Sequence, residues 1–150
     1  EYQHLVAQLA SVYAAKGHKV LVVSDRVQLL KNCAQLTGDR AICITGEMGH
    51  ELREAELDKI KSGEADVLYG TQSIFSEGVS LNELSALILG TPINNEPLLI
   101  QLIGRIIRKK EGKLTPVVLD IKLKGNTASR QARARMGVYL QEGYNIKNFT

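Results

Sequence analysis

Five short apolar runs rich in β-branched residues recur along the chain and constrain its fold more than any other feature. They are Val20 to Val23, Ala41 to Ile44, Val67 to Tyr69, Leu87 to Leu89 and Val117 to Ile121. Continuous apolar runs of this length are typical of strands that are buried on both faces of a sheet. The segments between them are long enough for helices, and one of these ends in Lys59 and Lys61 ahead of Gly63, a common helix stop.

Alternating strands and helices predict an α/β fold, a parallel sheet with helices on both faces. A leading helix, about Tyr2 to Ala15, and a trailing helix, about Ala128 to Gln141, complete the layers. The length of 150 residues fits a single domain, residues 1–150. Cys33, Cys43 and the scattered histidines show no metal-ligand spacing, so no metal site is expected. No apolar stretch is long enough to span a membrane.

Working residues of open parallel sheets lie in the loops that follow the carboxyl ends of the strands. The candidate loops are Ser24-Asp25-Arg26, Thr45-Gly46-Glu47, Gly70-Thr71-Gln72, Gly90-Thr91-Pro92 and the residues from Asp120 onward. All of them are polar or glycine-rich. Because loops in general are polar, this pattern supports the fold rather than a function.

Positive charge is concentrated in the last third of the chain. Residues 1–100 carry 8 Lys and Arg against 13 Asp and Glu, a net charge of −5, and residues 101–150 carry 11 against 3, a net charge of +8. Between Ile121 and Gln141 there is no carboxylate, and the basic residues are Lys122, Lys124, Arg130, Arg133 and Arg135. Such a segment indicates either a phosphate-facing surface or an ordinary solvated helix face, and both interpretations stay open.

The segment from Glu96 to Lys110 carries the strongest functional signal. On a helix, one face is apolar, formed by Leu99, Leu102, Ile103, Ile106 and Ile107, and the opposite face holds Gln101, Gly104, Arg105 and Arg108. A glycine on a solvated helical face costs up to about 1 kcal/mol relative to alanine, so we expect something to approach the backbone at Gly104. Two arginines one turn apart suit a polyphosphate, because guanidinium groups stay charged and bind phosphate oxygens as a fork.

The pattern Gln101-x-x-Gly104-Arg105-x-x-Arg108 resembles motif VI of superfamily 2 helicases and translocases. In that family the second RecA-like lobe presents this helix to ATP held by the first lobe. The resemblance implies that Arg108 is the arginine finger, that Arg105 contacts the γ-phosphate, and that Gln101 links the nucleotide and nucleic-acid sites. It also places Gly104 against the nucleotide. An arginine finger neutralises charge that develops on the transferring phosphoryl group.

Three further segments resemble the family in order and spacing. Val20 to Leu30 is similar to motif IV, Thr45-Gly46 to an intermediate loop that contacts the nucleic-acid backbone, and Gly70 to Leu81 to motif V. The resemblance implies nucleic-acid contacts at Ser24, Arg26, Thr45, Gly46, Thr71 and Gln72. It implies nucleotide contacts at Glu77, Gly78 and Ser80.

Two departures and one extension refine this resemblance. Ser80 stands where many relatives have Asp, so a hydroxyl replaces a carboxylate, and Gln101 stands where the DEAD-box RNA helicases have His. The stretch from Arg130 to Tyr144 looks like the closing helix of bacteriophage branch-migration DNA helicases. We therefore expect a phage or bacterial source and a cytoplasmic location.

The chain lacks the Gly-x-x-x-x-Gly-Lys-Ser/Thr loop that cradles phosphates, and it lacks an Asp-Glu pair for Mg²⁺. ATP and Mg²⁺ are therefore expected to be bound mainly by an N-terminal RecA-like lobe that precedes Glu1 in a longer polypeptide. The isolated chain is not expected to hydrolyse ATP. The expected track is DNA, with RNA possible, and it is gripped by its backbone, since aromatic residues for base stacking are few.

Two other classes of protein compete with a motor lobe. A Rossmann-like domain for small molecules should carry Gly-x-Gly-x-x-Gly after its first strand, but the turn here is Ser24-Asp25-Arg26-Val27. A protein-interaction domain with a decayed motor fold would be expected to lose the two arginines. Both arginines are present, which does not exclude this third class.

Overall fold

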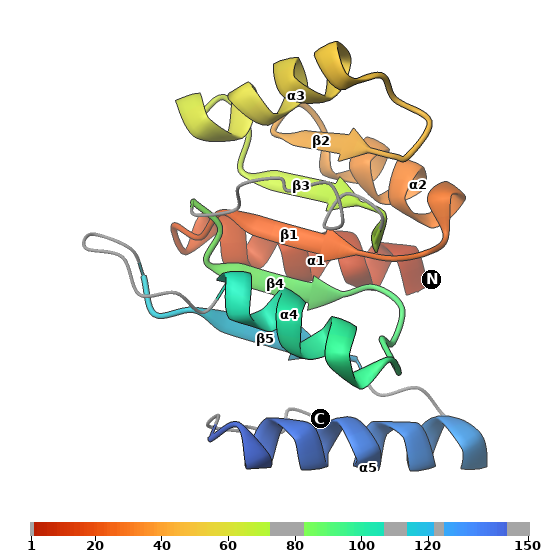
Figure 1. Cartoon of the computed structure of the whole chain (residues 1–150). Coiled ribbons are helices and arrows are strands. Elements are labelled where there is room, and N and C mark those ends of the chain that lie inside the picture. The colour runs from red at the N-terminus through yellow and green to blue at the C-terminus, as the bar shows by residue number, and fades with distance from the viewer. Residues whose placement is uncertain (1, 73–82, 107–113, 122–124, 144–150) are drawn as a thin grey trace.

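The computed structural model describes residues 2–72, 83–106, 114–121 and 125–143. Its centre is a five-stranded sheet in the order β2-β3-β1-β4-β5, with every pairing parallel (Figure 1). The strands are β1 (Val20–Val23), β2 (Ala41–Ile44), β3 (Val67–Gly70), β4 (Ala86–Leu89) and β5 (Val117–Asp120). All five predicted strands are confirmed, and their ends shift by at most one residue.

Helices separate these strands as the sequence predicts, except between β3 and β4, where residues 73–82 lie outside the described ranges. They are α1 (Tyr2–Ala15), α2 (Val27–Thr37), α3 (His50–Ser62), α4 (Glu96–Ile106) and α5 (Asn126–Gln141). The predicted leading helix is confirmed, and the trailing helix begins at Asn126 rather than at Ala128. At the end of α3, Gly63 adopts a left-handed conformation with φ of 85°, which a side chain would disfavour.

Two hydrophobic cores lie on opposite faces of the sheet. One is built by α1 and α2 with residues such as Val6 and Leu30, and the other by α3, α4 and α5 with residues such as Leu57, Leu99 and Val138. Figure 1 shows α1 on the far side of the sheet and α4 in front of it. Helices therefore cover both faces, which confirms the predicted parallel α/β architecture.

Burial of the strands explains why they read as continuous apolar runs. Every residue of β1, β3 and β4 is buried, and the edge strands β2 and β5 are partly covered. Full burial of one Leu, Ile or Val side chain contributes about 1.5–3 kcal/mol. None of the helices in these described ranges is long and apolar enough to cross a membrane.

Parallel strands send all of their following loops to one edge of the sheet. Figure 1 shows the strands pointing the same way, with α4 running back across the front of the sheet. The loops after β1, β2, β3 and β4 therefore meet at the carboxyl edge, and the far end of α4 lies toward the opposite edge. Candidate residues in the loops that follow the strands can therefore act together at the carboxyl edge.

A buried histidine lies at the amino edge, between α1 and β1. His18 is 8% exposed, and its Nδ1 lies 2.8 Å from Ser85 Oγ. The Tyr13 ring centroid is 5.8 Å from that of His18, and Lys16 Nζ lies over the Tyr13 ring. Burial, followed by the positive charge of Lys16, lowers the pKa of His18, so the native state favours the neutral ring.

This environment makes the stability of the fold depend on pH. In the unfolded chain His18 regains its ordinary pKa, about 6.5, and binds a proton more readily than in the native state. We expect urea unfolding to show a loss of stability between pH 7.5 and 5.5 that is smaller in His18→Gln than in the parent. His4→Gln, at an exposed position, should behave like the parent. Equal losses in the parent and His18→Gln would contradict this.

Candidate nucleotide and nucleic-acid interface

Hydroxyl side chains gather at the carboxyl edge of the sheet. In the order of strand pairing they are Thr45, Thr71, Ser24 and Thr91, which follow β2, β3, β1 and β4. Ser24 N donates to the Gly70 carbonyl at 3.2 Å, so the ladder continues one residue beyond the strands. Ser24, Thr45 and Thr71 are at most 8% exposed. This hydroxyl row therefore lines the edge instead of projecting from it.

The turns after β1 and β4 are tied to each other within this row. Thr91 Oγ1 donates to Asp25 Oδ1 at 3.1 Å, lies 3.3 Å from Ser24 Oγ, and accepts from Asp25 N at 3.3 Å. Ser24 Oγ accepts from Arg26 N at 3.0 Å. At Gly90 an added Cβ would lie 3.1 Å from the Val23 carbonyl oxygen. The lack of a side chain at Gly90 therefore lets the two turns approach closely.

Two helices, α2 and α3, begin at the same edge. The residues that precede α2 and α3 are Arg26 and Gly49, and neither makes a side-chain cap hydrogen bond within the described structure. The first amides of a helix carry partial positive charge and bind phosphate oxygens. Arg26 itself is exposed. The edge therefore combines the first amides of two helices and one exposed guanidinium with a row of hydroxyls that are nearly buried.

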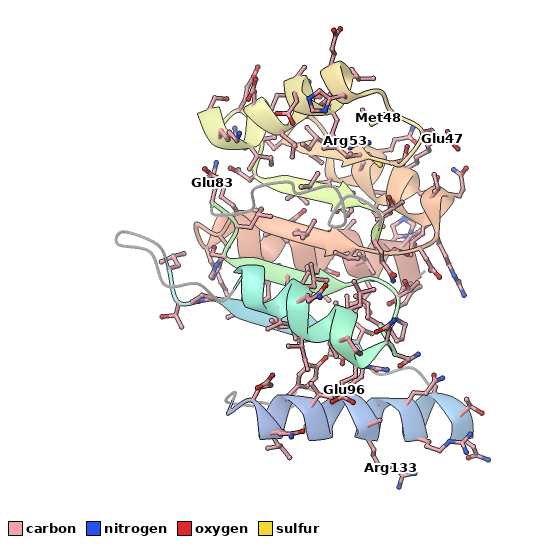
Figure 2. The ribbon with its side chains drawn as sticks, in the orientation of Figure 1. Glu47, Met48, Arg53, Glu83, Glu96 and Arg133 are labelled. Atoms are coloured by element: carbon pink, nitrogen blue, oxygen red, sulfur yellow. The ribbon has the colours of Figure 1, made fainter. Side chains whose placement is uncertain are left out.

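The loop between β2 and α3 is held from beneath by an arginine that the sequence analysis did not single out. Arg53 is 7% exposed, and its Nη2 donates to the Met48 carbonyl at 3.3 Å. Met48 N in turn donates to the Thr45 carbonyl at 3.2 Å. Figure 2 shows Glu47, Met48 and Arg53 close together beside this loop. The sequence signal was the helical spacing of Arg53, Leu57 and Ile60, which places an arginine on the apolar face.

The predicted amphipathic helix is confirmed over α4. Leu99, Leu102 and Ile103 are at most 1% exposed, while Gln101 and Gly104 are exposed on the opposite side. A Cβ added at Gly104 would meet no atom within 4 Å in the described part of the chain. The close approach predicted at this glycine is therefore not made by the described residues, which leaves room for an external ligand or partner.

The structure does not bring every candidate together. Ser24, Arg26, Thr45, Gly46, Thr71 and Gln72 lie at the carboxyl edge, and Gln101 and Gly104 lie on the outer side of α4 in front of the sheet. The backbone of Arg105 belongs to α4. Its side chain, together with Glu77, Gly78, Ser80 and Arg108, lies outside the described residues. No cluster of three or more His, Cys, Asp or Glu side chains that could hold a metal ion occurs within the described ranges.

An ion pair anchors α5 to the end of the sheet. Arg135 Nε and Nη2 donate to the two carboxylate oxygens of Asp120 at 2.7 and 3.0 Å, and Arg135 Nη1 donates to Asn94 Oδ1 at 2.7 Å. The Tyr139 hydroxyl donates to Asp120 Oδ2 at 2.5 Å. Arg135 is 3% exposed. One guanidinium therefore joins β5, α5 and the loop that leads into α4.

This finding corrects the interpretation of the basic segment at Arg135. Arg135 does not face phosphate, because its guanidinium is enclosed by Asp120 and Asn94. Asp120, at the end of β5, accepts hydrogen bonds from Arg135 and Tyr139 of α5. Arg130 and Arg133 are exposed, and Figure 2 shows Arg133 pointing away from the sheet. The helical spacing of Arg135, Val138 and Tyr139 was the signal that these side chains share an inward face.

Protonation equilibria reflect this enclosure. Burial, followed by the hydrogen bond to the Asp120 carboxylate, raises the pKa of Tyr139 far above its ordinary value. Burial alone would lower the pKa of Arg135, but its hydrogen bonds and ion pair with Asp120 raise it instead. Both side chains therefore stay protonated donors at neutral pH, and Asp120 remains their common acceptor.

Comparisons with known proteins place these elements in a family. The family model described as "Helicase conserved C-terminal domain" matches residues 2–110. The protein named "Probable helicase D10" of Escherichia phage T5 is 44% identical over 153 residues, which cover 100% of this chain and 34% of that protein. The "ATP-dependent DNA helicase uvsW" of Enterobacteria phage T4 is 25% identical over 119 residues, which cover 77% and 24%. The chain spans about a third or less of the length of these relatives.

Solved structures show the same fold. The crystal structure of T4 UvsW matches with a TM-score of 0.75 at 22% identity, covering 96% of this chain and 33% of that chain. A DEAD box protein from Methanococcus jannaschii matches with a TM-score of 0.73 at 21% identity, covering 100% and 39%. The five-stranded parallel sheet and its helices therefore form a RecA-like helicase C-terminal fold.

The burial of the Asp120–Arg135 pair predicts a large stability effect. Removal of one partner from a buried pair leaves an uncompensated charge, so Asp120→Ala should lower the free energy of unfolding by about 3 kcal/mol. Asp66→Ala is the matched control, because Arg40, the arginine that pairs with Asp66, has a side chain that is 57% exposed and stays solvated. Urea denaturation at pH 7 compares them. Equal losses in the two variants would show that the Asp120 pair is not effectively buried.

Proposed function

The chain belongs to the helicase conserved C-terminal domain family, and from this premise we propose that it is the second motor lobe of an ATP-dependent DNA helicase or translocase. The observation that carries the proposal is the match of the family over residues 2–110, a range that contains both the hydroxyl row and α4. The exposed Gln101 and Gly104 support a partner in front of α4. The proposed partner is an N-terminal RecA-like lobe of the same polypeptide.

In this proposal α4 supplies positive charge to a nucleotide held by the other lobe. Arg108 acts as the arginine finger, Arg105 contacts the γ-phosphate, and Gln101 links the nucleotide to the track. Glu77, Gly78 and Ser80 complete the contacts, and Gly104 leaves space for the nucleotide or the facing lobe. Guanidinium groups stay charged and stabilise the negative charge that develops during phosphoryl transfer.

ATP and Mg²⁺ are bound mainly by the other lobe in this proposal. The chain has no Gly-x-x-x-x-Gly-Lys-Ser/Thr loop, and no described cluster of carboxylates, His or Cys could hold a metal ion. Mg²⁺ would offset negative charge on the phosphates when it is bound there. The isolated chain is therefore proposed to be inactive as an ATPase, and residues of this lobe act only across the interface.

The carboxyl edge is proposed to grip the nucleic-acid backbone. Arg26 supplies exposed charge, and Gly46 and Gln72 lie in the same loops. The nearly buried hydroxyls of Ser24, Thr45 and Thr71 are proposed to face the phosphates from beneath. The starts of α2 and α3 add amides that bind phosphate. Contacts of this kind fix the position of the backbone without reading bases, which a motor that moves along any sequence requires.

DNA is the proposed track, because the relative uvsW is named a DNA helicase. The similarity to uvsW covers 77% of this chain. RNA is the second candidate, because the mimivirus protein named "Putative ATP-dependent RNA helicase L396" is 30% identical over 141 residues, which cover 89% of this chain and 25% of that protein. A cytoplasmic location in a phage-infected or bacterial cell is proposed from the phage relatives.

The arginine finger is tested in the full-length polypeptide with Arg108→Ala. Loss of an arginine finger costs about 10³-fold or more in kcat, so we expect nucleic-acid-stimulated ATPase activity to fall by about that factor, with nucleic-acid binding retained. Lys61→Ala removes an exposed positive charge at the end of α3 and should keep full activity. Activity of Arg108→Ala within twofold of the parent would remove the motor proposal.

The backbone grip is tested by the salt dependence of binding to single-stranded DNA. Arg26→Ala should weaken binding by a similar factor for every sequence and reduce the slope of log K against log salt by about one. Arg40→Ala, an exposed arginine beside the amino end of β2, should leave the slope unchanged. Fluorescence anisotropy with DNA and RNA strands of equal length also separates the two tracks. Binding that depends on sequence and not on salt would contradict the grip.

A further inference from the structure

The link between α5 and the start of α4 suggests a role beyond anchoring. Arg135 uses two of its nitrogens on Asp120 and directs the third, Nη1, to Asn94 Oδ1 at 2.7 Å. Asn94 is exposed in the loop between β4 and α4, and its neighbour Asn95 caps the first turn of the helix through Leu98 N. The buried pair therefore has a fixed, charged donor pointed at the segment from which α4 starts.

Asn95 directly precedes α4, which begins at Glu96. Its Oδ1 accepts from Leu98 N at 3.2 Å, and its carbonyl accepts from Leu99 N at 2.9 Å. A side-chain acceptor at this position satisfies amides that have no partner inside the helix. Because Asn94 and Asn95 are adjacent in the chain, a hydrogen bond that fixes Asn94 also restricts the cap. Loss of that bond would loosen the first turn of α4.

The Asp120 end of the link is rigid. Asp120 ends β5, which is paired in parallel with β4, and its Oδ2 accepts from both Arg135 and Tyr139. The guanidinium is planar, so a bidentate contact with Asp120 also fixes the direction of Nη1. Arg135 can therefore hold Asn94 in one place relative to the sheet.

We propose that Arg135 and Asn94 are positioning residues for α4. Through the Asp120–Arg135–Asn94 chain of hydrogen bonds, α5 sets the start of α4. The start of α4 in turn sets where Arg105 and Arg108 are placed during ATP hydrolysis. This inference rests on the proposed function of α4. Small displacements of a catalytic group lower the rate of the chemical step more than they weaken substrate binding. The effect should therefore appear in kcat and not in KM for ATP, since the other lobe holds most of the nucleotide.

The test uses Asn94→Ala in the full-length polypeptide, because Asn94 is exposed and its truncation leaves the Asp120–Arg135 pair intact. Asn32→Ala is the matched control, since Asn32 Nδ2 donates to Gln3 Oε1 at 3.0 Å between α2 and α1, on the other face of the sheet. Asn94→Asp keeps an acceptor for Arg135 and should restore the parent behaviour.

Two measurements are made on each variant. Hydrogen exchange at the amides of Leu98 and Leu99 should be about tenfold faster in Asn94→Ala, which corresponds to about 1.4 kcal/mol and suits the loss of a charge-assisted hydrogen bond. We expect kcat for ATP to fall by a similar factor with KM within twofold, and Asn94→Asp to recover both. Asn32→Ala should leave both measurements at parent values.

The outcomes separate this inference from the motor proposal. Unchanged exchange at the start of α4 overturns it, and so does faster exchange with kcat at the parent value. A fall in kcat that Asn94→Asp does not recover also overturns it, as does a tenfold rise in KM with kcat unchanged. Failure of the motor proposal appears elsewhere, as full ATPase activity in Arg108→Ala, and leaves the exchange result to be judged on its own.

Discussion

The parallel hydrogen-bond ladder centred on β1 is the constraint on which the rest of the structure depends. β1 pairs with β3 on one side and β4 on the other, and all of its residues are buried. A buried backbone must pair its amides and carbonyls, and the neighbouring strands provide those partners. Since the strands are parallel, each connection must cross a face of the sheet, and the connections β1–β2, β2–β3 and β4–β5 do so as the helices α2, α3 and α4. The layers follow from this requirement.

The same constraint creates the functional edge. The strands end in register, so polar residues that lie far apart in the sequence, such as Ser24 and Thr91, meet within hydrogen-bond distance. Amides at the beginnings of α2 and α3 face the same way as the strand ends. An edge built from backbone dipoles and short hydroxyls suits a regular chain of phosphates, because neither group requires a particular base.

The Asp120–Arg135 pair connects the last helix to this framework. A buried ion pair is weak evidence for stability, since desolvation offsets most of the attraction between the charges. It does fix geometry, because a guanidinium held by both carboxylate oxygens has one orientation left for its remaining donor. In this protein that donor meets Asn94, beside the cap of α4. The last helix thereby becomes part of the layer that contains α4.

Sequence alone determined the architecture and the exposed face of α4. Hydrophobic periodicity located every strand and the leading helix, since burial on both faces of a parallel sheet leaves a continuous apolar run. The spacing of Gln101, Gly104 and the two arginines indicated one face of one helix, and its exposed side is confirmed at Gln101 and Gly104. These patterns involve residues that are close together in the chain, so they can be identified from the sequence without the tertiary structure.

Tertiary structure decided which distant side chains meet. A basic stretch without carboxylates looked like one surface, yet Arg135 turns inward to Asp120 while Arg133 points away from the sheet (Figure 2). Arg53 supports the loop at Met48 from the buried face of α3. The charge pattern of the sequence could not distinguish the buried arginines from the exposed ones. The partner of a buried charge is set by the packing of elements that lie many residues apart in the chain, and local sequence patterns do not specify that packing.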